Sequence, residues 1–307
     1  MHSCSTAISG NYDGAIRTFW NAQFDALQNG ERVVDIGTGN GALPLLAKDS
    51  AARRGIFLDI HGVDIADIDP PATVKGGEKT YEGVKFHPKT SSAHLPFPDG
   101  SVTLVCSQFA FEYTPRQATI SEILRVIGRD GRAAFVVHSD RSIIATISEQ
   151  QLAGCCYLLQ GDIFANAHAM IGVLSKAPNP ALRSALANDP HAESARTAFN
   201  TSAAALMEMM AANENAAILR KTADQIRNAL SAAGHQKSIA LSILDSAQAA
   251  VNDEKLRLQQ LRRALVNPDE LAAIASFFRS AGYTVTSSSL EQRPGIEMGW
   301  TLVVGNG

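Results

Sequence analysis

The segment with the clearest chemical meaning is residues 33–42, which reads Val-Val-Asp-Ile-Gly-Thr-Gly-Asn-Gly-Ala. An apolar run leads into glycines at 37, 39 and 41 and then into helix-forming residues. Glycine adopts the backbone conformations of a sharp turn and lets backbone N–H groups come close to a bound molecule. The segment therefore predicts a strand, a ligand-binding turn and a helix.

The acid at Asp35 narrows the choice of ligand for this turn. A carboxylate at the mouth of the turn would repel a pyrophosphate, which a dinucleotide places there. S-adenosylmethionine carries no phosphate and has a positive charge, so it is compatible with Asp35. The glycines alone leave the dinucleotide open, because Gly37, Gly39 and Ala42 also satisfy the looser G-x-G-x-x-G/A pattern.

A second carboxylate, Asp64, ends the next apolar run, residues 60–65. An acid at the end of the second strand can accept hydrogen bonds from both hydroxyls of a ribose. Asp64 therefore indicates an adenosine-type ligand without choosing between the two cofactors.

Residues 91–105 favour S-adenosylmethionine over a dinucleotide. They read Ser-Ser-Ala-His-Leu-Pro-Phe-Pro-Asp-Gly-Ser-Val-Thr-Leu-Val, and with residues 35–41 they resemble the class I S-adenosylmethionine-dependent methyltransferases that modify small molecules. The resemblance spans residues 30–141 and 267–305. Ser91 and Thr103 depart from it, since relatives commonly have Asp at both positions.

The resemblance implies S-adenosylmethionine as the cofactor and a set of residues that bind it. Two of them, Tyr12 and Arg17, would close over the methionine end of the cofactor. The complete set is Tyr12, Arg17, Asp35, Gly37, Thr38, Gly39, Asn40, Asp64, Ile65, Ser91, Ser92, Ala93, Ser107 and Gln108.

Three residues are candidates for chemistry on the acceptor, because ligands of an open α/β sheet lie beyond the carboxyl ends of its strands. His138 follows a buried strand and is the candidate general base. Glu112 and Tyr113 are candidates for orienting the acceptor or the amino group of the cofactor. The alternatives stay open: a strand-end histidine bonded to backbone, an acid at a helix start and a packed aromatic side chain.

Alternating strands and helices predict an α/β fold, a Rossmann-like, seven-stranded, mostly parallel sheet with helices on both faces. Residues 142–266 interrupt it with helical periodicity and no strand, so we expect a core of residues 1–141 and 267–307 and a helical insertion. The insertion is expected to form a cap over the acceptor. A stripe at Leu244, Val251, Leu258 and Leu265 either packs within the cap or, as we slightly favour, forms a homodimer contact.

Composition excludes several other classes of protein. The chain has 45% hydrophobic and 19% charged residues and a net charge of −3, which favours a small-molecule acceptor over nucleic acid. No apolar run suits a membrane span, no secretory signal begins the chain, and the four cysteines lack zinc spacing, so we expect a cytoplasmic protein without a metal. The alternatives to methyl transfer at oxygen, nitrogen or carbon are an NAD(P)-dependent oxidoreductase, another use of the same cofactor, and a cofactor-binding protein without transfer activity that acts through its insertion.

Overall fold

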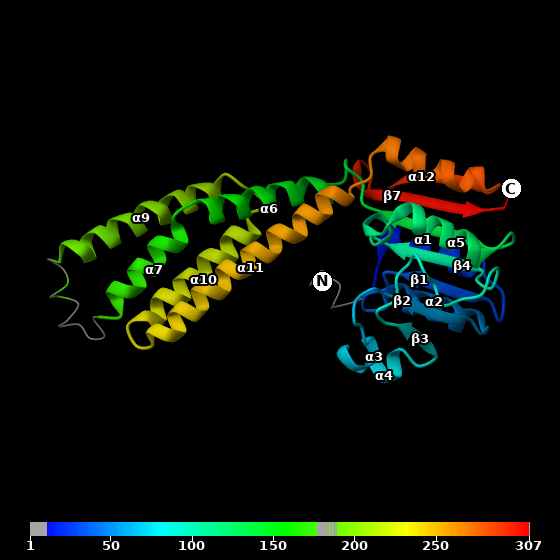
Figure 1. Ribbon diagram of the computed structural model, residues 1–307, viewed down its shortest axis with the longest axis horizontal. Coiled ribbons are helices and arrows are strands. Elements are labelled where there is room, and N and C mark those ends of the chain that lie inside the picture. The colour runs from blue at the N-terminus through cyan, green and yellow to red at the C-terminus, as the bar shows by residue number, and fades with distance from the viewer. Residues whose placement is uncertain (1–10, 177–183, 185, 187–188, 307) are drawn as a thin grey trace. The chain divides into compact units, whose positions relative to one another are not determined.

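The computed structural model describes residues 11–176, 184, 186 and 189–306. The chain divides into two compact units (Figure 1): Met1–Ala145 with Ala264–Gly307, called the core unit below, and Thr146–Arg263, called the helical unit. Cys4 and most of residues 177–190, a Pro- and Asn-containing stretch that we expect to separate helices of the insertion, lie outside the described residues. None of the helices described is both long and apolar enough to cross a membrane.

The core unit is built on one seven-stranded sheet in the order β3-β2-β1-β4-β5-β7-β6. Strands β1 to β5 are parallel, whereas β7 is antiparallel to both β5 and β6. The strands are β1 Arg32–Ile36, β2 Asp59–Val63, β3 Val84–His87, β4 Leu104–Gln108, β5 Arg132–Val137, β6 Thr284–Arg293 and β7 Ile296–Gly305. This order confirms the predicted Rossmann-like, mostly parallel sheet.

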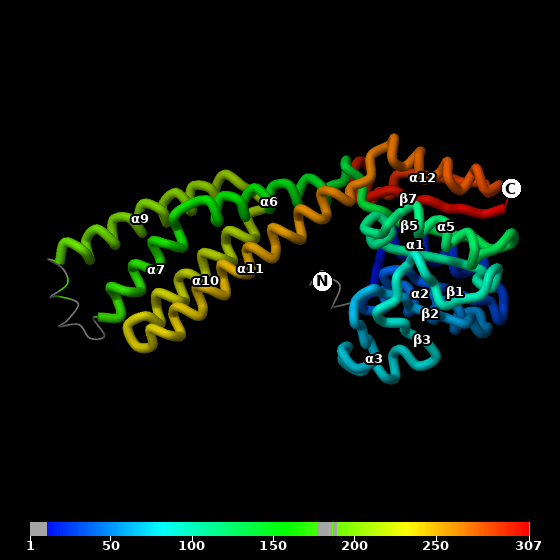
Figure 2. The backbone as a smooth tube through the Cα atoms, in the orientation of Figure 1, coloured from blue at the N-terminus to red at the C-terminus, as the bar shows by residue number. Residues whose placement is uncertain are grey.

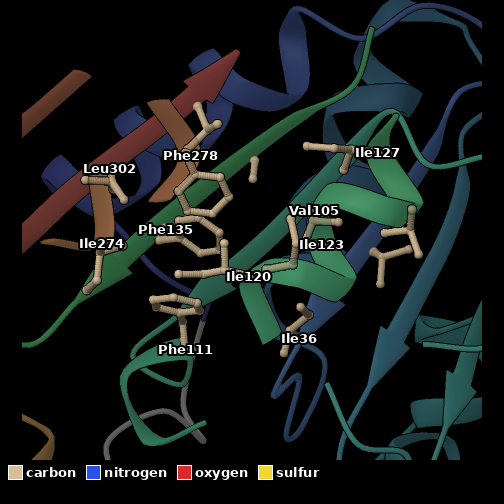
Figure 3. Packing of buried hydrophobic residues seen from close by; sticks show 14 of the residues in the cluster. Ile36, Val105, Phe111, Ile120, Ile123, Ile127, Phe135, Ile274, Phe278 and Leu302 are labelled. Atoms are coloured by element: carbon tan, nitrogen blue, oxygen red, sulfur yellow. The ribbon is translucent and has the colours of Figure 1, made fainter. Parts of the chain in front are cut away.

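Helices cover both faces of the sheet, as the sequence predicts. On one face, α1 (Gly14–Asp25) and α2 (Ala42–Arg54) share an apolar cluster with alternate residues of β1, β4 and β5. On the other face, α5 (Arg116–Ile127) and α12 (Pro268–Ser280) pack on the intervening residues of the same strands. Figure 3 shows this second cluster, where Phe135 of β5 lies between Phe111 and Phe278.

Several elements differ from their predicted bounds. The apolar run of residues 101–109 is typical of a buried strand, but β4 begins only at Leu104, and β2 ends at Val63, before Asp64. The prolines and glycines of residues 66–83 are typical of a surface connection, and this segment between β2 and β3 contains two four-residue helices, α3 Pro70–Thr73 and α4 Gly77–Thr80. The start of α12 is as predicted, because Asn267 and Glu270 form a reciprocal capping box.

The helical unit has an apolar core of its own. Figure 2 traces the backbone through its helices, which are α6 Ile143–Gln160, α7 Ile163–Leu174, α9 Pro190–Ala211, α10 Ala217–Ala233 and α11 Lys237–Ala264. Leu244, Val251 and Leu258 of α11 are buried in this core. These side chains pack within their own unit, which is the first of the two alternatives for the stripe. A homodimer contact through α11 stays a prediction and would have to use other side chains of the helix.

Candidate functional site

The candidate site lies at the carboxyl edge of the sheet, where β1 and β4 are neighbours. The order of the strands in the sheet reverses at this pair: β2 and β3 follow on the side of β1, and β5 follows on the side of β4. Ligands of open α/β sheets bind at such a reversal. The glycine turn follows β1, the segment 109–113 follows β4, and His138 follows β5.

The turn after β1 has the geometry that its glycines predict. Gly37, Gly39 and Gly41 all have positive φ angles, of 68°, 51° and 77°. The N–H groups of Gly37 and Thr38 donate to the carbonyl of Val63 at 2.8 and 3.0 Å, which fixes the turn against β2. A Cβ on Gly37 would lie 2.4 Å from that of Ala110, whereas a Cβ on Gly39 would meet open space. The turn therefore packs on its sheet side and is open beyond Gly39.

Asp64 lies directly beside the turn. Its Oδ2 accepts the N–H of Gly39 at 2.9 Å, and its Oδ1 accepts that of Ala66 at 2.9 Å. Each carboxylate oxygen has a second lone pair, so the group can still accept hydrogen bonds from a pair of hydroxyls. The neighbouring Ile65 is 66% exposed. Such an exposed apolar side chain beside a ribose-binding acid suits the flat face of an adenine.

Asp35 is enclosed behind the turn, with only 3% of its surface exposed. Burial, with a smaller contribution from the nearby charge of Asp64, raises its pKa to about 8. The thiol of Cys106 donates weakly to its Oδ1 at 3.9 Å. Asp35 is consequently a neutral acid at neutral pH until a positive charge comes near it. The thiol is also buried, and this burial raises the pKa of Cys106, as is typical of an unreactive cysteine in an apolar strand.

The loop at the predicted adenine side uses its own hydroxyls to hold its shape. The Ser91 hydroxyl accepts the N–H of Ala93 at 3.2 Å, and the Ser92 hydroxyl lies 2.9 Å from that of Thr119 on α5. Further along, the carboxylate of Glu122 accepts the N–H of Leu95 at 2.6 Å. An adenine role for residues 91–93 remains a prediction, with the Ser92 side chain turned toward α5.

Two polar side chains end β4, and the structure gives them different surroundings. The hydroxyl of Ser107 is fully buried and donates to the carbonyl of Ile36 at 2.8 Å, so it joins β4 to β1. The carboxamide oxygen of Gln108 accepts the indole N–H of Trp20 at 2.5 Å. The Gln108 nitrogen, Nε2, is buried and has no hydrogen-bond partner among the described residues.

The remaining predicted cofactor residues surround α1 and the start of α2. The Asn40 carbonyl accepts the hydroxyl of Tyr81 at 2.5 Å, so its backbone supports the turn. Tyr12 packs against the apolar cluster beneath α1. Arg17 instead pairs with Asp49 at 3.6 Å, two helical turns beyond the start of α2, with both side chains well exposed. The structure brings Tyr12 to this face and leaves Arg17 on the surface.

His138 is held by the group predicted to act beside it. Oε1 of Glu112 lies 2.6 Å from Nδ1 of His138 and also accepts the backbone N–H of His138 at 2.9 Å. Phe109 stacks on the imidazole with ring centres 4.2 Å apart, and Tyr113 meets it edge-on at 6.1 Å. The three predicted residues are thus brought together, with Glu112 acting on His138. The helix-start alternative for Glu112 does not account for these contacts.

Two members of the site were not predicted. In the sequence, Trp20 is one of several apolar residues at helical spacing between 12 and 28, and only its indole nitrogen separates it from Phe19 and Phe24 as a partner for Gln108. Phe109 has a φ of 53°, which is rare outside glycine and asparagine and places its ring on His138. The sequence contains no local signal for that conformation.

Several features of the site suit S-adenosylmethionine. Two buried polar atoms at this edge, Gln108 Nε2 and Glu112 Oε2, have no hydrogen-bond partner among the described residues. Buried polar groups normally find partners, so unpaired ones at the reversal of the sheet indicate a polar ligand. The turn, Asp64 and Ile65 supply the surfaces for an adenosine, and no lysine or arginine lies among the turn residues to hold a pyrophosphate.

Comparison with known proteins supports the same reading for part of the chain. Residues 34–135 match the family model described as a methyltransferase domain. The relative named uncharacterized methyltransferase YcgJ, from Bacillus subtilis (strain 168), is 32% identical over 109 residues, which cover 35% of this chain and 40% of that protein. The chain therefore spans less than half the length of that relative.

Two solved structures resemble the core over part of its length. The structure of YcgJ from Bacillus subtilis shares 22% identity over 45% of this chain and 58% of that chain, with a TM-score of 0.35. A geranyl diphosphate methyltransferase in complex with GPP and sinefungin shares 20% identity over 41% of this chain and 45% of that chain, with a TM-score of 0.34. The match over residues 34–135 is to a methyltransferase domain, as the resemblance of residues 35–41 and 91–105 predicts, and it favours S-adenosylmethionine over a nicotinamide dinucleotide as the cofactor of this domain.

Proposed function

We propose that this chain transfers a methyl group from S-adenosylmethionine to a small-molecule acceptor. The main support is the contact of 2.6 Å between the buried Glu112 carboxylate and Nδ1 of His138, at the sheet edge that carries the cofactor turn. The cofactor, when bound, supplies a methyl group on a positively charged sulfur. The protein has to bind both molecules, align them, exclude water and accept any proton that leaves the acceptor.

Each cofactor residue would contact a different part of S-adenosylmethionine. Asp64 would accept hydrogen bonds from the ribose hydroxyls, and Ile65 would lie against the adenine. The open backbone at Gly39 would let the cofactor approach the turn. Asp35 would ionise when the positive sulfur is bound, because a nearby positive charge favours the carboxylate form.

His138 would act as the general base. With Nδ1–H of His138 donating a hydrogen bond to Glu112, the lone pair of Nε2 would be free to take a proton. The same carboxylate would stabilise the imidazolium that forms, as the acid of a catalytic triad does. Tyr113, edge-on to the imidazole, would contribute to orienting the acceptor, whose methylated atom is oxygen, nitrogen or carbon.

The helical insertion is proposed to select the acceptor. Its two ends join the core unit beside the candidate base: the N–H of Val266 donates to the carbonyl of His138 at 2.9 Å, and Ser139 forms a parallel bridge with Val266. A helical segment connected at that point is well suited to act as a cap. Any homodimer formed through the insertion would have to use side chains outside the buried stripe of α11.

The proposal is tested with methyl-labelled S-adenosylmethionine, the purified chain and a cytoplasmic metabolite extract, followed by mass spectrometry. We expect a labelled small molecule that is absent without the protein and absent with a His138→Ala variant that still binds S-adenosylhomocysteine. A second variant, in which a short Gly-Ser linker replaces residues 146–263, should keep cofactor binding and lose the product. If no labelled product forms although the cofactor binds, the chain is instead a cofactor-binding protein without transfer activity.

A further inference from the structure

The side chains of Trp20 and Gln108 form a buried polar pair inside an otherwise apolar interface. Trp20 of α1 is fully buried, and its indole nitrogen lies 2.5 Å from Oε1 of Gln108, 88 residues further along the chain. Gln108 is only 9% exposed. A polar pair in this position is costly unless every polar atom is satisfied.

The indole fixes which way the carboxamide points. A tryptophan Nε1 is a donor only, so the Gln108 atom that faces it must be the oxygen. The amide nitrogen, Nε2, therefore faces away from α1. This nitrogen has no hydrogen-bond partner in the described part of the chain, although it carries two N–H groups. An unpaired buried donor costs free energy that a ligand with an acceptor atom would recover.

The position of Gln108 indicates which ligand atom that is. Gln108 is the last residue of β4 and pairs with Val136 of β5. Along β4 it lies two residues beyond Cys106, the partner of Asp35, so both side chains are on the α1 face. Asp64, at the end of β2, is separated from β4 by β1 alone, which is two strand spacings or roughly 10 Å. A cofactor with its ribose on Asp64 reaches Gln108 with the opposite end, the methionine part.

We propose that the Gln108 amide donates a hydrogen bond to the carboxylate of the cofactor's methionine part, and that Trp20 is the positioning residue that aims this amide. The inference rests on the proposed function and names the group that Gln108 recognises. A carboxylate is the strongest hydrogen-bond acceptor at that end of the cofactor. Arg17, which was expected there, pairs with Asp49 on the surface, so Gln108 supplies the donor instead.

The test compares two ligands that differ only beyond the thioether sulfur. S-adenosylhomocysteine has the amino acid part, and 5′-methylthioadenosine lacks it; both are titrated calorimetrically into the full-length protein. Gln108→Glu keeps an oxygen for Trp20 and replaces the amide nitrogen with a second, negatively charged oxygen. It should lower the affinity for S-adenosylhomocysteine by roughly 10- to 100-fold and change the affinity for 5′-methylthioadenosine by less than about threefold. Gln108→Ala should also lower the affinity for S-adenosylhomocysteine.

Trp20→Phe removes the indole N–H and keeps an aromatic ring in the core. We expect it to lower the affinity for S-adenosylhomocysteine by about three- to tenfold, again with little change in the affinity for 5′-methylthioadenosine. The matched control is Trp300→Phe, which removes an indole N–H that donates to the carbonyl of Val266 at 3.0 Å and should leave both affinities unchanged.

Two results would overturn the inference. An equal loss of affinity for both ligands would mean that Gln108 and Trp20 only support the fold, and no loss for either would mean that the amide does not contact the cofactor. Failure of the wild-type protein to bind either ligand would instead contradict the proposed function itself, so the two failures are distinguishable.

Discussion

One oxygen of Glu112 holds His138 at two points. Oε1 lies 2.6 Å from the imidazole Nδ1 and accepts the backbone N–H of the same residue at 2.9 Å. The carboxylate thereby ties the ring to its own backbone, while the stacked Phe109 restricts the ring plane. The imidazole cannot turn without losing a buried charge-assisted hydrogen bond, so Nε2 has one direction in which to accept a proton.

Substitutions of this pair should reduce the rate of methyl transfer and not cofactor binding. His138→Ala removes the base and should lower kcat by about 10²- to 10⁴-fold. Glu112→Gln keeps the shape and loses the charge that stabilises the imidazolium, so we expect a smaller loss in kcat, about tenfold or more. Glu82→Gln, on the exposed surface, is the control. Steady-state kinetics and titration with S-adenosylhomocysteine check the result. An unchanged kcat in His138→Ala would remove His138 from the mechanism.

Asp35 should make the folded protein less stable as the pH rises. Its pKa is about 8 in the folded protein, against an ordinary value near 4 in the unfolded chain. Between these values the folded state holds one proton more than the unfolded state. Raising the pH therefore favours unfolding, by at most about 1.4 kcal/mol per pH unit from this residue.

The Asp35→Asn variant isolates this contribution. Its free energy of unfolding, measured in urea from pH 5 to pH 8, should lack the downward slope that Asp35 adds to the wild-type protein. The difference between variant and wild type should grow steadily over that range and level off above about pH 8. Two parallel curves would show that Asp35 is already ionised in the folded protein, despite its burial.

Much of the core unit was predictable because its local signals agree with one another. The bounds of β1, β3 and α5 follow from the apolar runs and their flanking turns, and Asn267, Pro268 and Glu270 mark the start of α12 as observed. The turn glycines and Asp64 were found because their roles depend on backbone conformation and strand order. Both are properties that short segments of sequence contain.

The rest depends on contacts between residues far apart in the chain. Glu112 contacts His138, 26 residues away, because η2 (Phe111–Tyr113) packs against the end of a strand. Trp20 contacts Gln108, 88 residues away, because α1 packs there in the same way. The heptad stripe of α11 was ambiguous for the same reason, since the same spacing suits burial in one chain or between two. Sequence pattern identifies an apolar face and leaves its partner undetermined.

The two glycines of the turn should respond differently to the same substitution. Both Gly37 and Gly39 have positive φ angles, so alanine strains the backbone at each, by about 1 kcal/mol. At Gly37 the new Cβ would also lie 2.4 Å from that of Ala110, whereas at Gly39 it meets nothing within 4 Å. Gly37→Ala should therefore lower the free energy of unfolding by several kcal/mol more. Gly39→Ala should stay folded and bind S-adenosylhomocysteine more weakly, because its methyl group occupies the open space beside the turn. Chemical denaturation and calorimetry measure both effects, and equal stability losses would contradict this account of the turn.

The buried stripe of α11 should stabilise the helical unit without contributing to self-association. Leu258 is 1% exposed in the core of the unit, whereas Leu256, two residues earlier, is 58% exposed. Leu258→Ala leaves a cavity and should cost about 2–5 kcal/mol, while Leu256→Ala should stay within about 0.5 kcal/mol of the wild type. Hydrogen exchange over residues 237–264 should show the loss of protection for Leu258→Ala alone. The molecular mass measured by light scattering should be the same for all three proteins. If Leu258→Ala dissociated a dimer, the stripe would be an interface after all, and its burial within one chain would not describe the protein in solution.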